Sequence, residues 1–246
     1  MLDNPRQEFS ALKAQISAIK CNSKNSDSPS LPLDGGTIDQ TLGEGLPLGC
    51  LHEVAGTAAD GFATMLAALF TAHLEEPVLW CIDGRQARHP FAPGLAGMWI
   101  AIERLTIAYC KTPKDMLWAI EEGLKSGAAA LVIGEPPRPL DLTASRRLQL
   151  TAGTSGATGL ILGQQNLAPN ACTTRWQARA IPTPDLDTAW GGAWRLKLTR
   201  SRNGGTGSWD VVWSSNGPID EKDIGHEKTH HLCLVFETCD RQDSAA

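Results

Sequence analysis

One segment of the chain, residues 53–64, has the outline of a phosphate-binding loop. In the pattern G-x-x-x-x-G-K-[ST], the lysine reaches the phosphates and the hydroxyl binds magnesium. Gly56 and Gly61 keep the glycine spacing, but Phe62 stands at the lysine position and Ala63 at the hydroxyl position. The pattern therefore predicts a loop without phosphate chemistry. The alternative is coincidence, because two glycines five residues apart are expected by chance among the 24 glycines of this chain.

The elements around this segment indicate an α/β fold. Residues 50–55 predict a strand before the loop, and residues 61–74 predict a helix after it. Unbroken apolar runs, which suit strands buried on both faces of a parallel sheet, recur along the chain. These runs cover residues 77–83, 105–110, 128–133 and 158–162. Helical patterns at 63–75, 94–101, 114–126 and 142–153 alternate with them, with Asp141 and Thr143 as candidate starts of the last helix. The expectation is a mostly parallel central sheet flanked by helices.

The pattern changes after Pro169. Three segments alternate apolar and polar residues, which is typical of half-buried strands: 174–181, 194–200 and 208–213. A glycine-rich stretch at 203–207 separates the last two, as in a β-hairpin. We expect antiparallel strands added to one edge of the sheet.

The ends of the chain have a different composition. Residues 1–20 predict an amphipathic helix, and residues 21–44 predict a linker rich in Ser, Asn, Pro and Gly. The core is expected over residues 45–215, followed by a polar tail over 216–246 with one apolar run at 231–236.

The bulk properties narrow the class of protein. A net charge of −5 argues against a broad non-specific nucleic-acid surface, although it leaves room for a local basic patch. The seven scattered cysteines contain no C-x-x-C pair, which favours a reducing cytoplasm over a disulfide framework. No signal peptide is visible and no apolar run reaches about 18 residues, so a soluble, cytoplasmic protein without a membrane span is expected.

The order of motifs resembles the RecA core and, more closely, the ImuA family of RecA-related proteins from bacterial mutagenic translesion-synthesis cassettes. The resemblance spans about residues 45–213. Its segments are GLPLG at 45–49 with HEV at 52–54, VLWC at 78–81, APGL at 92–95, LWAIEE at 117–122, LDLTASRRLQL at 140–150, TRW at 174–176, and GSW at 207–209 before VVW at 211–213.

Comparison with RecA-like ATPases implies further site positions. Arg85 matches their catalytic glutamate, Glu135 an acidic residue that is retained, and Gln165 a glutamine at the end of the following strand. Arg200 and Arg202 match two basic residues that reach a neighbour's nucleotide in RecA filaments. The resemblance therefore implies a RecA-like core that lacks a functional phosphate loop.

The function implied by the resemblance is that of an accessory protein in SOS-induced translesion DNA synthesis, without a cofactor. Its implied partners are an ImuB-type inactive Y-family polymerase and a second, replicative-type polymerase. RecA-type cores often self-associate, so homo-oligomers are compatible with the resemblance, and direct DNA contact stays open. Two alternatives remain: a DNA-dependent ATPase with an atypical site, and a cell-division inhibitor of the SulA type.

The segment 226–230 matches the zinc motif H-E-x-x-H, but it lies in a polar tail with no apparent third ligand, so a solvated tail and no metal site are expected. Strand alternation places Arg200 and Arg202 on one face of the strand end and Lys197 on the other. These basic residues could contact phosphates or an acidic partner, and the alternative is a solvated strand end.

Tryptophan is abundant, with eight residues in the chain. Trp80 and Trp118 lie in apolar patterns that predict core positions. Four more, at positions 190, 194, 209 and 213, cluster in the later strands. Core packing is the favoured interpretation for each of these, with an interface position as the alternative.

Overall fold

The computed structural model describes residues 29–33, 36–85, 90–163, 169–182, 192–202 and 204–214, together with the strand at 231–237. The helix expected within residues 1–20 and most of the tail lie outside the described residues. The described strands are β1 (Ser30–Leu31), β2 (Leu46–Pro47), β3 (Leu51–Ala55), β4 (Val78–Asp83), β5 (Leu105–Cys110), β6 (Leu131–Gly134), β7 (Thr158–Gly163), β8 (Thr174–Ala180), β9 (Gly192–Ser201), β10 (Gly207–Ser214) and β11 (His231–Glu237). The helices are α2 (Thr37–Leu42), α3 (Ala59–His73), α4 (Ala92–Gly97), the short 3-10 helix η1 (Ile102–Arg104), α5 (Pro113–Ser126) and α6 (Leu142–Ser155).

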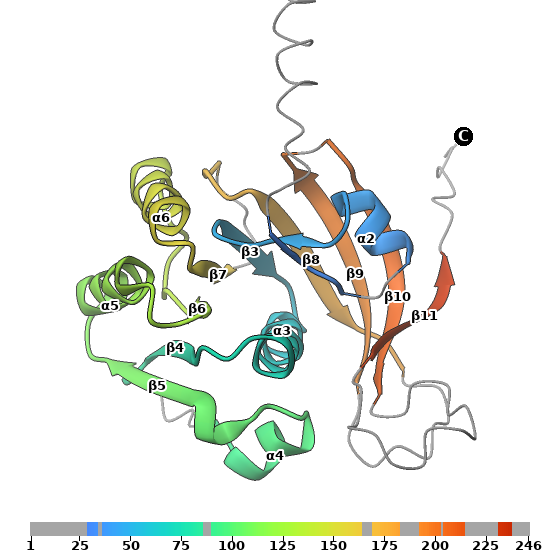
Figure 1. The fold of residues 1–246 in the computed structure, drawn as a ribbon, viewed down its shortest axis with the longest axis horizontal. Helices are drawn as coiled ribbons and strands as arrows, with labels where there is room; N and C mark the ends of the chain where they lie inside the picture. The colour runs from blue at the N-terminus through green and yellow to red at the C-terminus, as the bar shows by residue number, and fades with distance from the viewer. Residues whose placement is uncertain are drawn as a thin grey trace, which may run out of the picture.

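Nine of the described strands form one sheet in the order β11-β10-β9-β8-β3-β7-β6-β4-β5 (Figure 1). The strands from β8 to β5 are all parallel to their neighbours. Beside β8, the strands β9, β10 and β11 continue the sheet by antiparallel pairing. This arrangement confirms the predicted α/β fold, with a mostly parallel sheet and antiparallel strands added late in the chain.

Helices cover both faces of the parallel part, with α5 and α6 on one face and α3 on the other (Figure 1). Met116, Ile120 and Leu124 recur every four residues along α5 and are buried in a core cluster with β-strand residues such as Val132 and Ile161. This spacing places the three side chains in one apolar stripe that packs against the sheet, as is typical of an amphipathic helix. The fully buried residues of α3 form the larger cluster on the opposite face.

Capping residues set the ends of α5 and α6. Thr112 and Asp115 form a capping box at the start of α5, and Asp141 accepts a hydrogen bond of 2.7 Å from the Ala144 N–H at the start of α6. Both helices end at a glycine in the left-handed region, Gly127 with φ 63° and Gly156 with φ 82°. Asp141 is therefore confirmed as the helix start.

The range expected as a linker, 21–44, contains ordered elements in its described part. β1 pairs with β2, and α2 follows. Ile38 and Leu42 of α2 are fully buried in the larger core cluster. The Asp39 carboxylate accepts hydrogen bonds of 2.9 and 3.1 Å from the Leu33 N–H. Residues 36–44 therefore belong to the packed structure.

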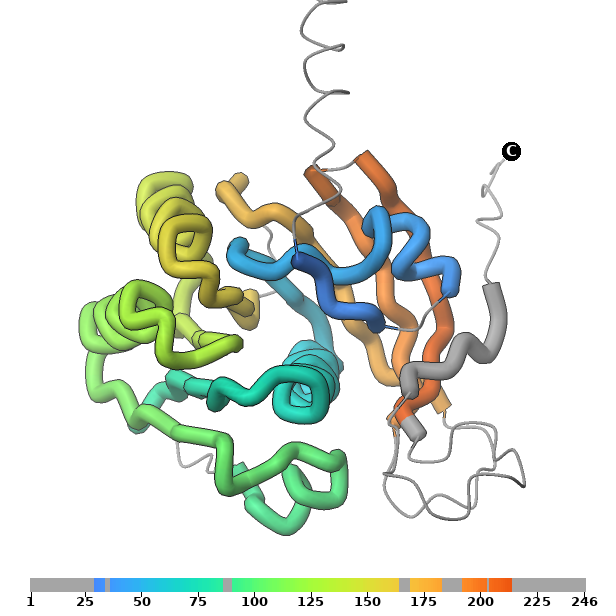
Figure 2. The backbone as a smooth tube through the Cα atoms, in the orientation of Figure 1, coloured from blue at the N-terminus to red at the C-terminus, as the bar shows by residue number. Residues whose placement is uncertain are grey.

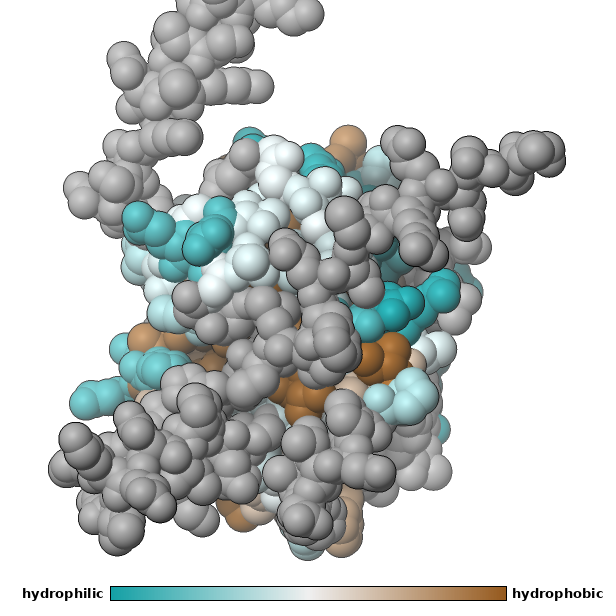
Figure 3. All heavy atoms as spheres, turned by 90° about the vertical axis from the view of Figure 1, so that its right-hand side faces the viewer, coloured by the Kyte–Doolittle hydropathy of each residue, from teal (hydrophilic) through white to brown (hydrophobic). Residues whose placement is uncertain are grey.

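Of the six tryptophans with a predicted position, Trp190 lies outside the described residues. Trp80, Trp194, Trp209 and Trp213 are at most 6% exposed, as expected for core residues. The prediction for Trp118 was wrong, because its side chain is 64% exposed on the outer side of α5. The apolar pattern around it is carried by Met116 and Ile120, which occupy the buried stripe. In Figure 3, hydrophobic residues are visible near the middle of the molecule with hydrophilic residues beside them, and such mixed surfaces are normal for folded proteins.

His52 on β3 joins a buried hydrogen-bond chain. The indole N–H of Trp176 donates to the Thr174 hydroxyl at 2.8 Å, and that hydroxyl lies 2.7 Å from His52 Nδ1. His52 Nε2 lies 2.9 Å from the Pro47 carbonyl oxygen, which can only accept. This geometry assigns the proton of a neutral imidazole to Nε2. Burial lowers the pKa of His52 from 6.5 to about 4, and the bond to Pro47 opposes that shift.

We predict that this histidine makes the fold sensitive to mild acid. The pKa of His52 is lower in the folded state, so the unfolded chain binds more protons between about pH 6.5 and 4. The contribution of this group to the free energy of unfolding is therefore complete above pH 6.5 and decreases as the pH falls toward 4. The loss from this one group is about 3 kcal/mol by pH 4. Denaturant unfolding curves at a series of pH values measure it. A His52→Gln variant, whatever its absolute stability, should show a correspondingly flatter pH dependence, and an unchanged slope would contradict the assignment.

Candidate functional site

The segment that resembles a phosphate loop is a short βα turn. Only residues 56–58 separate the end of β3 from the start of α3 at Ala59 (Figure 2). In a phosphate-binding loop, the backbone N–H groups between the glycines cradle the phosphates. Here Ala59, Asp60 and Gly61 are already helical. The glycine spacing therefore coincides with a tight turn and the first turn of α3.

The turn is tied to β8. The Ala58 N–H donates to the Ala178 carbonyl at 3.1 Å, and the Ala59 N–H donates to the Gly56 carbonyl at 3.2 Å. Gly56 has φ 114°, and a Cβ at this position would lie 2.2 Å from the Ala178 oxygen. Only glycine fits such a close backbone approach. The requirement for Gly56 thus follows from packing between β3 and β8.

Phe62 and Ala63 point into the core, and both are completely buried. The Phe62 ring lies 5.5 Å from the Trp176 ring between centroids, and Trp176 lies 6.2 Å from Trp209. A Cβ on Gly61 would come within 2.9 Å of Trp194 Nε1. Aromatic packing therefore surrounds the positions at which a working loop has its lysine and hydroxyl.

Arg85 and Glu135 follow the ends of two neighbouring strands, and each is held by a nearby side chain. Arg85 Nε and Nη2 donate to the two Asp83 carboxylate oxygens at 2.9 and 2.7 Å. This partner raises the pKa of Arg85. The indole N–H of Trp80 donates to Glu135 Oε1 at 2.7 Å. Gln165 lies outside the described residues.

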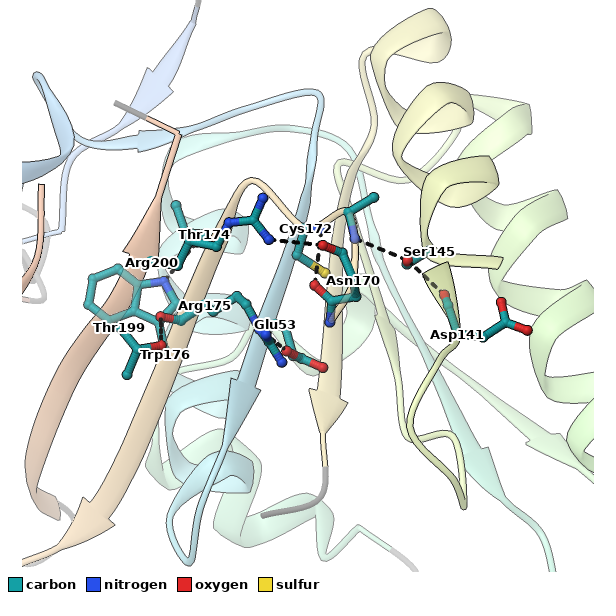
Figure 4. Close-up of polar contacts among 11 residues, drawn as sticks. Glu53, Asp141, Ser145, Asn170, Cys172, Thr174, Arg175, Trp176, Thr199 and Arg200 are labelled. Atoms are coloured by element: carbon teal, nitrogen blue, oxygen red, sulfur yellow. Dashed lines mark hydrogen bonds and ion pairs between the residues drawn. The ribbon is translucent and has the colours of Figure 1, made fainter. Parts of the chain in front are cut away.

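Arg200 and Arg202 lie at the end of β9. Arg200 Nη1 donates to the Asn170 carbonyl at 2.9 Å (Figure 4). Both arginines are exposed. The prediction that Lys197 lies on the opposite face from Arg200 was wrong. Register with β8 pairs Lys197 with Gln177 and Arg200 with Arg175, two positions on one face of β8. A bulge at Thr199 inserts one extra residue in β9 and reverses the alternation beyond it.

Glu53 of β3 and Arg175 of β8 form a buried ion pair that the sequence did not predict. Arg175 Nε donates to Glu53 Oε2 at 2.6 Å, and the two side chains are 10% and 4% exposed (Figure 4). Parallel register places them directly opposite each other. The available signal was one acidic and one basic residue inside two predicted strands of a buried sheet. Their pairing depends on β3 and β8 being neighbours.

The sequence also gave expectations about a metal site, a membrane span and the state of the cysteines. The segment 226–230 lies outside the described residues. Within the described ranges, no three His, Cys, Asp or Glu side chains are grouped to hold a metal ion. The same part of the chain contains no helix long and apolar enough to cross a membrane. Four described cysteines, at positions 50, 81, 110 and 172, are buried free thiols.

Comparison with known proteins identifies the family. The chain is 30% identical to Protein ImuA from Caulobacter vibrioides strain NA1000 / CB15N over 226 residues, covering 83% of this chain and 87% of that protein. Protein ImuA from strain ATCC 19089 / CIP 103742 / CB 15 matches with the same identity and coverage. No family model matches the chain. On the identity and coverage of these two relatives, the chain belongs to the ImuA family.

Proposed function

We propose that this protein is a non-catalytic RecA-like accessory protein in SOS-induced, error-prone translesion DNA synthesis. It serves as a scaffold that binds an ImuB-type inactive Y-family polymerase and supports a second, replicative-type polymerase in the cytoplasm. Membership of the ImuA family supports the place in DNA damage response and mutagenesis.

The burial of Phe62 carries the non-catalytic part of the proposal. An ATP polyphosphate needs cationic side chains and free backbone N–H groups, and each charge-assisted hydrogen bond contributes about 1.5–3 kcal/mol. Phe62 offers no charge and is fully buried against Trp176. The backbone supports the same conclusion, because α3 begins at Ala59 and the Ala58 N–H bonds to Ala178.

The residue that stands where RecA-like ATPases have their catalytic glutamate also supports a non-catalytic role. Phosphoryl transfer depends on electrostatic stabilisation by lysine and magnesium together with a residue that orients the nucleophile. Removing a single preorganised donor can already cost about a hundredfold in rate. The residue at the glutamate position is Arg85, which is bound to Asp83 and cannot act as a base. Losing lysine, hydroxyl and glutamate together leaves little basis for hydrolysis.

ATP binding and turnover by the purified full chain test this part of the proposal. We expect no binding below millimolar ATP and no hydrolysis, with or without single-stranded DNA, in parallel with an active RecA-like ATPase as the control. DNA-stimulated turnover that disappears in a Glu135→Ala variant would instead mean that the protein is a divergent RecA-like motor.

Co-purification after DNA damage tests the scaffold part. We expect the tagged protein to recover an ImuB-type polymerase, with the second polymerase joining through that complex. Recovery of a tubulin-like division protein without the ImuB-type partner would favour the division-inhibitor alternative and overturn the proposal. Self-association, measured on the same purified material, stays a prediction of the RecA resemblance.

A further inference from the structure

One face of β8 and β9 carries a row of cationic side chains. Cross-strand register pairs Arg179 with Arg195, Gln177 with Lys197, and Arg175 with Arg200. Directly paired residues share a face, so these side chains form one surface. We call it the basic sheet face, defined by the exposed residues Arg179, Arg195, Lys197 and Arg200. Arg175 lies on the same side of the sheet but is buried in its ion pair with Glu53.

The alternation of burial shows that this face is turned outward. Arg195, Lys197 and Arg200 are exposed on β9, whereas the intervening Leu196 and Leu198 are fully buried. On β8, Arg179 is exposed while Ala178 is buried. The part of the sheet formed by β8 and β9 thus has an apolar side against the core and a cationic side toward solvent.

Only part of this charge is neutralised by acidic residues. Glu53 binds Arg175, and Asp210 of β10 binds Arg195 through two hydrogen bonds of 2.7 Å. Arg179 and Lys197 have no ion-pair partner among the described residues. Arg200 donates to a neutral carbonyl and keeps its charge. Three positive charges therefore remain on this face of a chain whose net charge is −5.

Such like charges oppose one another within the sheet. Arg179 and Arg195 stand directly opposite, an arrangement that destabilises antiparallel pairs. Asp210 offsets the charge of Arg195, and a bound anion would offset the charges that remain on Arg179, Lys197 and Arg200. Cations two residues apart along a strand are spaced by about 6.5 Å, so the face presents a repeated charge that suits a repeated anion.

We propose that the basic sheet face binds the phosphate backbone of nucleic acid. The choice of nucleic acid over an acidic protein rests on the proposed function in DNA synthesis. The binding is electrostatic and independent of sequence, because the described aromatic residues of β8 and β9, Trp176 and Trp194, are buried on the opposite side and offer no stacking platform. Gln177, which is paired with Lys197 on the neighbouring strand, adds a neutral amide donor.

The salt dependence of binding reports the number of phosphates that are neutralised. For three cations, the slope of log K against log salt is about −3 for duplex DNA and about −2 for a single strand. Fluorescence anisotropy of labelled duplex and single-stranded oligonucleotides of unrelated sequences, measured on the full chain from about 50 mM salt upward, gives both slopes. Equal affinity for unrelated sequences is expected.

A matched pair of variants locates the contact. Arg179→Gln combined with Lys197→Gln removes two charges from the face, and Lys114→Gln combined with Lys125→Gln removes two exposed charges from α5. Both variants have the same net charge. We expect the first to bind about tenfold or more weakly with a slope smaller by about 2, and the second to bind within about twofold of the original protein. Unfolding curves check that both variants are folded.

Three results would overturn the proposal. The first is no binding of either oligonucleotide at low salt, and the second is an equal loss of binding in both variants. The third is binding of an acidic polypeptide through this face with no change in DNA binding, which would assign the face to a protein partner. None of these three results depends on ATP. DNA binding by this face can therefore fail while the protein remains non-catalytic, and ATP hydrolysis could be found while DNA binding by this face is confirmed.

Discussion

Phe62→Lys, which restores the lysine of the phosphate-loop pattern, is expected to destabilise the protein by more than about 4 kcal/mol and to confer no ATP hydrolysis. Phe62 is completely buried and its ring contacts Trp176. Removing a buried phenylalanine ring costs about 3–5 kcal/mol, and placing an unpaired ammonium group in an apolar site adds a further penalty. Denaturant unfolding measures the loss.

The chain offers a matched control for this substitution. Phe91 is 69% exposed, so Phe91→Lys should change stability by no more than about 0.5 kcal/mol. Phe62→Leu, which keeps an apolar side chain, should cost less than Phe62→Lys. If Phe62→Lys left the protein as stable as the original and able to bind ATP, position 62 would face a phosphate site and not the core.

Glu53→Gln and Arg175→Met, made one at a time, should each cost about 3–5 kcal/mol. Removing one partner of a buried ion pair leaves the other charge buried and uncompensated. The pair is well suited to show this, because the atoms are 2.6 Å apart and both side chains are at most 10% exposed. The double variant should cost much less than the two single costs together, since neither charge is then left alone.

An exposed pair provides the contrast. Lys125 and Glu122 on α5 lie 3.4 Å apart with side chains 69% and 45% exposed. Lys125→Met should therefore change the unfolding free energy by less than about 1 kcal/mol. Additive costs for Glu53→Gln and Arg175→Met, within about 0.5 kcal/mol, would mean that the two residues do not interact and that the register of β3 with β8 is different.

Local patterns in the sequence predicted the elements of the core. Apolar runs and helical periodicity depend on neighbours within a few residues, so they report which segments become strands and helices. The predicted helix 114–126 and strand 174–181 agree with α5 and β8 within one residue. Asp141 caps α6 because a cap is a local hydrogen bond.

The faces on which single side chains lie were predicted less well. Trp118 fits an apolar run, yet the buried stripe of α5 passes through Met116 and Ile120. Lys197 shares a face with Arg200 because a bulge at Thr199 adds one residue to β9. A bulge depends on how two strands pair, so period-two alternation along one strand could not reveal it.

For this protein, the sequence by itself determined the α/β class, the order of the elements, the family resemblance and the presence of Phe and Ala, rather than lysine and a hydroxyl residue, at positions 62 and 63. Only the tertiary structure decided that Phe62 enters an aromatic core, that Glu53 binds Arg175, and that the cations of β8 and β9 form one outward face. These three features join residues from different strands. Their physical origin is strand order and register, which arise when the whole sheet assembles and which short-range patterns do not encode.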